Sequence, residues 1–245
     1  MRALIPQSSI VLRWRPALAF CVLAAGLLCA SACGVSSRAA EANASFPHAT
    51  VDSVKAAGPL QTAVLAGGCF WGTQAVFEHV RGVKRVMAGY AGGPQNAATY
   101  AQVSTGRTGH AESIQITFDP REVSYGEILR VFFSVAHDPT ELDRQGPDVG
   151  TQYRSVIFYA AADQQRIALA YIAQLQHAQL FHRAIITRVE PLAGFYPAEG
   201  YHQDFLVRHP YDPYIIYNDL PKLSNLQRVL PDDYSERPAL VAQSR

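Results

Sequence analysis

The strongest constraint on the fold is a change of hydrophobic period between residues 62 and 80. Residues 62–66 form a short apolar run that two glycines close, which is typical of a buried strand ending in a turn. Apolar residues then return at helical spacing, at Phe70, Val76, Phe77 and Val80. We therefore expect a strand that turns directly into a helix, with Cys69 at the turn.

The chain beyond this helix alternates strand-like and helix-like patterns. Strand character occurs at residues 83–90, 113–118, 155–159 and 185–189. Ser124 and Glu127 form a capping box at the start of one helix, and a long helical pattern covers about 163–180. The order is roughly β-α-β-β-α-β-α-β. We expect an α+β fold, a two-layer sandwich of a mainly antiparallel sheet with helices on one side and a ferredoxin-like βαββαβ core.

Residues 1–33 have the features of an export signal. Three arginines precede an apolar stretch over residues 17–32, which is short for a membrane span of about 20 residues. Residues 30–34 also resemble the lipobox of bacterial lipoproteins, in which cleavage leaves a lipidated cysteine, here Cys33. We expect an exported protein, either periplasmic or anchored to a bacterial membrane through lipidated Cys33. A soluble secreted form is the alternative.

Composition sets the expected limits of the folded part. Residues 34–60 are rich in Ala, Ser, Val and Gly without an apolar period, which predicts a flexible linker. Residues 61–230 are then one domain, and residues 231–245 are expected to be a frayed tail. The 245-residue chain has a formal net charge of +1, so its charge gives no indication of nucleic acid binding.

Cys69 is the only cysteine after residue 33. A thiol at the first turn of a helix lies near unpaired backbone N–H groups and the positive end of the helix dipole. Both lower the pKa of the thiol and favour a nucleophilic thiolate. A buried structural cysteine is the alternative that position alone leaves open.

The motif Gly68-Cys69-Phe70-Trp71-Gly72 resembles the signature of the peptide methionine sulfoxide reductases of the A class. The resemblance extends from about Thr62 to Arg228. Its further motifs, in chain order, are Gly89-Tyr90-Ala91-Gly92-Gly93, Tyr100, Thr108-Gly109-His110-Ala111-Glu112, His137-Asp138-Pro139, Arg144-Gln145-Gly146-Pro147-Asp148, Gly150-Thr151-Gln152-Tyr153-Arg154-Ser155 and Tyr201-His202-Gln203.

By this resemblance, Cys69 attacks the sulfur of methionine sulfoxide, free or in proteins and in its S epimer, and becomes a sulfenic acid. The resemblance implies that Glu112, Tyr100 and Tyr153 hold the sulfoxide oxygen. It places the substrate contacts at Phe70, Trp71, Asp148, Gly68 and His202, with the two aromatic residues forming the pocket for the S-methyl group. Glu112 must be protonated to donate, and we expect nearby aromatic rings to raise its pKa.

Three other readings of these residues remain open. Cys69 with His110 or His202 could form the nucleophile and base of a hydrolase or acyltransferase. The same three residues could hold zinc, but no metal-binding spacing is present, so we expect no metal. The domain could also bind methionine sulfoxide without turnover. The glycines at 89, 92 and 93 lack the pattern of a phosphate loop, so no nucleotide is expected.

Two positions depart from the family pattern. Gln74 occupies a place where the motif usually has Glu, which changes the charge near the helix start. Residues 70–245 contain no cysteine, whereas many members carry C-terminal cysteines that reduce the sulfenic acid. We therefore expect no bound cofactor and an external thiol reductant, which could be thioredoxin, glutaredoxin or a small thiol, acting on a monomer.

Cys33 offers a second route for recycling. A flexible linker between it and Cys69 would span roughly 30 to 36 Å, which would let a free Cys33 thiol reach the site. Lipidation of Cys33 would close this route, because its sulfur would then be a thioether.

Overall fold

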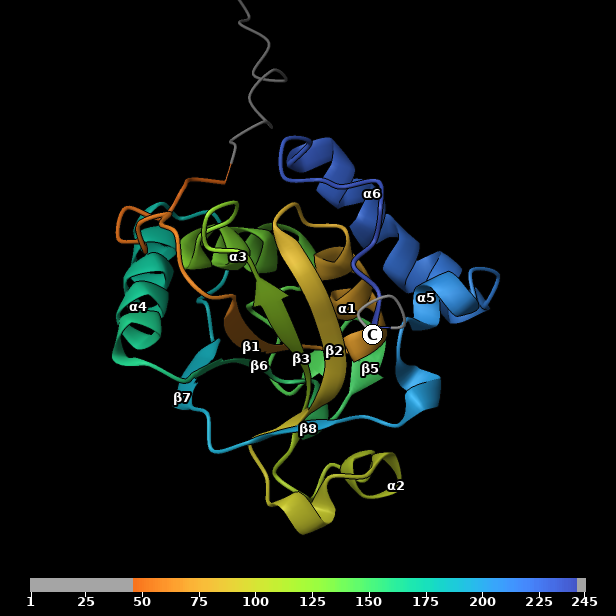
Figure 1. Ribbon diagram of the computed structural model, residues 1–245. Coiled ribbons are helices and arrows are strands. Elements are labelled where there is room, and N and C mark those ends of the chain that lie inside the picture. The colour runs from red at the N-terminus through yellow and green to blue at the C-terminus, as the bar shows by residue number, and fades with distance from the viewer. Residues whose placement is uncertain (1–45, 242–245) are drawn as a thin grey trace, which may run out of the picture. The chain divides into compact units, whose positions relative to one another are not determined.

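The computed structural model describes residues 46–241 (Figure 1). The predicted export signal, the lipidation site and residues 34–45 of the predicted linker lie outside the described residues. The strands are β1 (Gln61–Gly67), β2 (Val83–Ala91), β3 (Ala111–Phe118), β4 (Arg144–Gln145), β5 (Asp148–Val149), β6 (Ser155–Tyr159), β7 (Arg188–Pro191) and β8 (Phe195–Pro197). The α-helices are α1 (Phe70–Glu78), α2 (Tyr100–Val103), α3 (Tyr125–Val131), α4 (Ala162–His177), α5 (Phe205–Arg208) and α6 (Leu220–Val229).

Six strands form one sheet in the order β7-β6-β1-β3-β2-β8, and β4 pairs only with β5. All neighbours in the large sheet are antiparallel except β6 and β7, which are parallel. The α+β class is confirmed, but the sheet is mixed rather than antiparallel throughout. The reason is that α4 connects β6 to β7 as a crossover helix, and strands joined in this way run parallel.

Alternation along the strands divides the core between the two faces of the sheet. Leu65 and Ile114 point to the face covered by α1, α3, α4 and α6, where they join the main hydrophobic cluster. Val64 and Ala111 point to the opposite face, where a smaller cluster packs against Leu192 and Phe195. Figure 1 shows α3 and α4 on one side of the sheet and α6 along α1. Helices α1, α3, α4 and α6 therefore form a layer on one face of the sheet.

The predicted elements agree with the structure to within a few residues, but several elements were not predicted. The capping box of α3 is confirmed, since Ser124 accepts from the Glu127 N–H and the Glu127 side chain accepts from the Ser124 N–H. The long helix α4 ends at His177, and β7 begins at Arg188 instead of residue 185. Helix α6, in which a single residue, Leu226, is buried, was not predicted. The short elements α2, β4, β5, β8 and α5 were not predicted either.

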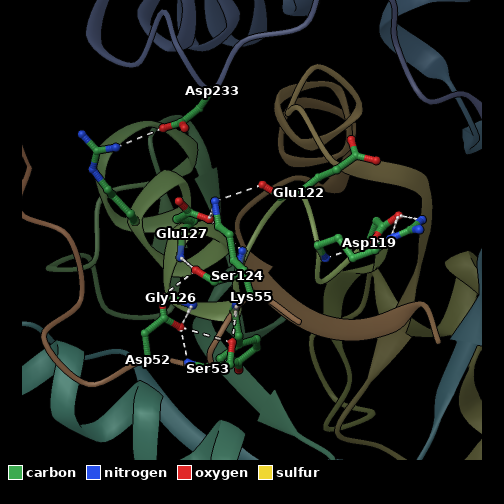
Figure 2. A network of polar contacts seen from close by, with 12 residues as sticks. Asp52, Ser53, Lys55, Asp119, Glu122, Ser124, Gly126, Glu127 and Asp233 are labelled. Carbon is green, nitrogen blue, oxygen red and sulfur yellow. Dashed lines mark hydrogen bonds and ion pairs between the residues drawn. The ribbon is translucent and has the colours of Figure 1, made fainter. Parts of the chain in front are cut away.

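Residues 46–53 are packed on the domain, so the prediction of a linker is wrong for this part, whereas residues 54–60 are exposed. Figure 2 shows Asp52 at the start of α3, where its carboxylate accepts from Ser124 Oγ at 2.6 Å and from the Gly126 N–H at 2.7 Å. Lys55 Nζ pairs with Glu127 Oε2 at 2.8 Å. Composition could not indicate these contacts, because Asp52 finds its partner 72 residues further along the chain. Three apolar residues of this segment, Phe46, Ala49 and Val51, pack against the core.

Residues 231–241 are also packed rather than frayed. Tyr234 forms a β-bridge with Val80, and its ring stacks on that of His79 with centroids 5.6 Å apart. The Asp233 carboxylate pairs with Arg130 at 3.0 Å (Figure 2). These long-range contacts hold the C-terminal segment against α1 and α3, which a local reading of Pro and Asp content could not predict. No helix within residues 46–241 has the length and apolar character needed to cross a membrane.

We predict that Asp52→Ala lowers the free energy of unfolding by about 2 kcal/mol, because it removes a charged acceptor from two donors of α3. Urea denaturation followed by circular dichroism measures this change. The matched control is Asp163→Ala in the first turn of α4, whose side chain is 83% exposed and pairs only with Arg166. Equal stability of the two variants would contradict the structural role of residues 46–53.

Candidate active site

The site begins at the turn between β1 and α1. Gly68 has a φ of +91°, in the left-handed region that favours glycine. A Cβ at this position would lie 2.5 Å from Gln145 Cγ, so the backbone can make this approach only without a side chain. The predicted strand-to-helix turn is therefore present. Gly68 packs against Gln145, and its role in the site is to let the backbone turn from β1 into α1.

Cys69 is the N-cap residue of α1 and is 8% exposed. The Trp71 N–H faces the thiol and lowers its pKa, as the helix-terminus argument expected. Burial outweighs this effect, and the charges of Glu112 and Asp219 act in the same direction as burial. The pKa of Cys69 is raised well above its ordinary value, so the expected lowering is wrong. The thiol is protonated at neutral pH before substrate binds.

Glu112 comes from β3 and reaches the first turn of α1. It lies on the same face of the strand as Ile114, which places its side chain under the helix layer. Its Oε2 accepts from the Phe70 N–H at 3.1 Å. Burial raises the pKa of Glu112 to about 8, against the opposing effect of the Phe70 N–H. The direction agrees with the expectation, and the carboxyl is mostly protonated at pH 7.

Tyr100 and Tyr153 are half-buried and lie near the same two groups. Tyr100 starts α2, and its N–H donates to Glu199 Oε1 at 2.9 Å. Burial raises the pKa of both phenols, and the charges of Glu112 and Cys69 contribute further. Both hydroxyls therefore keep their protons and are available as hydrogen-bond donors. The fold thus brings Cys69, Glu112 and the two tyrosines into one cluster, as the resemblance implied.

An aromatic group surrounds Trp71 beside this cluster. The Trp71 ring stacks on Phe205 with centroids 3.7 Å apart and meets Tyr214 edge-on at 5.9 Å. Its Nε1 donates to His202 Nδ1 at 3.1 Å. The His202 ring in turn lies 5.0 Å from that of Phe70 and 4.6 Å from that of Tyr100. These contacts fix Trp71 and line the site with apolar ring surface.

Asp148, in β5, accepts a hydrogen bond from the Tyr214 hydroxyl. Burial raises the pKa of Tyr214, and Cys69 and Asp148 add to this effect. Asp148 also raises the pKa of Glu112. The supporting polar position implied for Asp148 therefore lies next to the site, where it is engaged by Tyr214.

No hydrogen bond joins Cys69 to His110 or His202 within residues 46–241. His110 accepts from the Gly93 N–H at 3.2 Å, and its other ring nitrogen lies 3.0 Å from the Pro94 carbonyl oxygen, so backbone groups occupy both nitrogens. The polar contact of His202 goes to Trp71, and burial lowers its pKa. Across residues 46–241, no three His, Cys, Asp or Glu residues are arranged to hold a metal ion.

Gln74 faces away from the thiol, in a buried amide network. Its Nε2 donates to the Val86 carbonyl at 3.0 Å and to Gln203 Oε1 at 3.3 Å, and its Oε1 accepts from the Asp204 N–H at 3.1 Å. Gln203 in turn bonds both the N–H and the carbonyl of Ala88. Gln74 therefore joins α1 to β2 and to the chain around residue 203, a role that its position in the motif did not suggest.

Several residues of the site were missed by the sequence analysis. They are Glu199, Phe205, Tyr214, Asp219 and Lys222. All follow residue 198 and reach the site only through the path of the C-terminal segment. The one local signal is the density of aromatic residues between 195 and 217, which could have indicated a partner for Trp71.

The arrangement is suited to reduction of a polar, oxygen-bearing sulfur group. It holds a buried thiol next to a protonated carboxyl and two phenols, all of which can donate to an oxygen that becomes negatively charged. The rings of Phe70 and Trp71 supply apolar surface beside these donors.

Known proteins share this chain's sequence and fold. The family model described as peptide methionine sulfoxide reductase matches residues 61–233. A peptide methionine sulfoxide reductase from Mesorhizobium japonicum is 57% identical over 187 residues, which cover 76% of this chain and 96% of that relative. The reduced form of Mxr1 from Saccharomyces cerevisiae aligns with a TM-score of 0.58 and 30% identity, over 66% of this chain and 92% of that one. Methionine sulfoxide reductase A of Corynebacterium diphtheriae aligns with a TM-score of 0.56 and 35% identity, over 69% and 84%.

A match of the family model over most of the chain, together with a relative at this identity, shows the family. The reductase assignment also decides between the activities that the residues alone left open. The chain belongs to the peptide methionine sulfoxide reductases, and it is an enzyme that reduces methionine sulfoxide.

Proposed function

We propose that Cys69 is the nucleophile of this reductase and that Glu112 is its proton donor. The observation that carries this proposal is the burial of both groups at the first turn of α1, where Glu112 is held by the Phe70 N–H at 3.1 Å. The Cys69 sulfur attacks the sulfoxide sulfur while the oxygen takes a proton from Glu112. The proton of the thiol replaces the one that Glu112 has given up. The oxygen then moves from the methionine sulfur to the Cys69 sulfur as the bond between the two sulfurs breaks, so methionine leaves and Cys69 becomes a sulfenic acid.

Tyr100 and Tyr153 supply the remaining hydrogen bonds to the sulfoxide oxygen. Their raised pKa values support this role, because a phenol that keeps its proton can donate throughout the reaction. Phe70 and Trp71 receive the S-methyl group, with His202 holding Trp71 in place through the bond to its Nε1. Asp148 supports Tyr214, and Gly68 shapes the turn. The substrate is the S epimer of methionine sulfoxide, free or within oxidised proteins.

Recycling of Cys69 uses an external thiol, from thioredoxin, glutaredoxin or a small molecule. The first thiol attacks the sulfenic sulfur, which releases water and forms a mixed disulfide. A second thiol attacks that disulfide and restores Cys69, leaving the two reductant sulfurs joined. The absence of cysteine from residues 70–245 supports this route, and the enzyme holds no cofactor.

The contacts of residues 46–53 do not favour recycling of Cys69 by Cys33. A span of roughly 30 to 36 Å requires a flexible linker over residues 34–60, whereas residues 46–53 pack on the domain through contacts such as those of Asp52.

We further propose that the enzyme is exported and works as a monomer, in the periplasm or on a bacterial membrane to which lipidated Cys33 anchors it. The features of residues 1–33 support this proposal. We interpret β6-β1-β3-β2, which are antiparallel neighbours, with α1 and α3 as the ferredoxin-like core of the domain.

We predict that Glu112→Gln slows the reductase step by about 10²- to 10⁴-fold, because an amide cannot deliver a proton to the leaving oxygen. Single-turnover formation of methionine measures this step. At pH 7 the alkylation rate of Cys69 should stay unchanged, because Glu112 with a pKa of about 8 is already neutral there. Above pH 8 the wild-type carboxylate slows alkylation and the variant does not.

Glu122→Gln is the matched control, since that carboxylate is exposed and pairs with Lys84. It should leave both rates at the wild-type value. Wild-type methionine formation by the Glu112→Gln variant would contradict the assignment of the proton donor.

We predict that the full chain with Cys33→Ser reduces one epimer of methionine sulfoxide with dithiothreitol at the wild-type rate, because an external thiol can reach the Cys69 sulfenic acid. Separate assays of the two epimers measure this turnover. The control Cys69→Ser should reduce neither. Accumulation of sulfenic acid without turnover in the Cys33→Ser protein would mean that Cys33 is the resolving thiol.

A further inference from the structure

A buried ion pair from the C-terminal segment lies against the helix that carries Cys69. Asp219 ends a π-helical turn, Ile215–Asp219, and is 1% exposed. Its Oδ1 lies 3.3 Å from Lys222 Nζ, one turn into α6. Its Oδ2 is buried and has no hydrogen-bond partner within residues 46–241. A buried carboxylate oxygen without a partner is costly, so the position calls for a reason other than stability.

The pair reaches α1 at Gly72. A Cβ at Gly72 would lie 2.1 Å from Asp219 Oδ1 and 3.0 Å from Lys222 Nζ, so glycine is what allows the two charges to approach the helix. Gly72 is three residues after Cys69, and residues at this spacing are neighbours on the same helix face. Both charges therefore lie against the first turn of α1, at whose start Cys69 lies, and both act on its thiol.

The charged and titratable groups around Cys69 come from several elements. They are Glu112 of β3, Tyr100 of α2, Tyr153 of the turn Thr151–Tyr153, Tyr214, Asp219 and Lys222, with Asp148 of β5 acting on Glu112 and Asp219. At pH 7 the phenols and Glu112 are neutral. Of the groups that act on the thiol directly, Asp219 and Lys222 then carry the charge, with opposite signs.

We propose that Asp219 and Lys222 act as a balanced pair of positioning residues that sets how readily Cys69 loses its proton. Lys222 favours the thiolate and Asp219 opposes it, so that the thiol stays protonated in the resting enzyme. The pair becomes unbalanced when Asp219 is neutralised, and the remaining lysine charge then favours the thiolate. The proposal rests on Cys69 as the nucleophile, but its test does not depend on turnover.

Removing the two charges one at a time should shift the reactivity of Cys69 in opposite directions. In the full chain, Asp219→Asn should shift the pH profile of Cys69 alkylation by iodoacetamide to lower pH by about 0.5. The alkylation rate at pH 7.5 should then be about threefold higher than in the wild type. Lys222→Gln should move it to higher pH by a similar amount. The double variant should return close to wild type. The rate is followed by mass spectrometry of the peptide that contains Cys69.

A matched control is available on α4, where Asp163 and Arg166 form an exposed pair with the same spacing and the same 3.3 Å distance. Asp163→Asn and Arg166→Gln should leave the alkylation profile unchanged. Shifts of the two site variants in the same direction, or no shift in either, would overturn the proposal. If Asp219→Asn does not fold, Lys222→Gln decides alone, since the Lys222 side chain is 22% exposed and that of Asp219 is 0% exposed. Faster alkylation or an unchanged rate in Lys222→Gln then contradicts the proposal.

The same variants separate this proposal from that of the nucleophile. Loss of methionine formation in Cys69→Ser tests the nucleophile, whereas the alkylation shift tests the charge pair. An enzyme that needs Cys69 but shows no shift retains the proposed function and loses the inference. If the alkylation profile shifts but the Cys69→Ser variant still forms methionine, the charge pair is retained and the assignment of the nucleophile is lost.

Discussion

The hydrogen bond between the Glu112 carboxyl and the Phe70 N–H joins the central strand β3 to the first turn of α1. This turn also carries Cys69, so one contact fixes the acid and the thiol relative to each other. The contact can form because Glu112 lies on the helix-covered face of β3, in the same row as Ile114 and Ile116. Glycine at position 68 completes it by letting the chain turn sharply between β1 and α1. The rest of the site is arranged around this junction.

Burial dominates the electrostatics at this junction. The helix terminus favours an anion, but the free energy of removing a thiolate or a carboxylate from water is larger than this effect. Both Cys69 and Glu112 therefore favour their neutral forms. For a reductase this arrangement has a use, because the acid keeps the proton that the sulfoxide oxygen requires. A protonated thiol is also less reactive toward other electrophiles until substrate arrives.

The segments outside the predicted domain complete the structure at both ends. Residues 46–60 stabilise the start of α3 through Asp52 and Lys55, and residues 231–241 bind the end of α1 through Tyr234. The chain from 199 to 222 contributes Glu199, Phe205 and Tyr214 to the site, and its last turn carries the Asp219–Lys222 pair. The residues that surround the reactive groups therefore come largely from a part of the sequence whose local patterns did not predict the site.

The sequence by itself determined the strand-to-helix turn, the capping box of α3, the α+β class and the residues of the reductase motif. Each depends on local spacing or on a continuous motif, so neighbours in sequence carry the information. Only the tertiary structure decided that Cys69 is protonated, that Gln74 bonds to the backbone of β2, and that the segments at 46–53 and 231–241 are packed. These properties depend on burial and on partners far along the chain. The burial of a side chain and its pairing with distant residues depend on how the sheet and the helices pack together. No local sequence pattern specifies that packing.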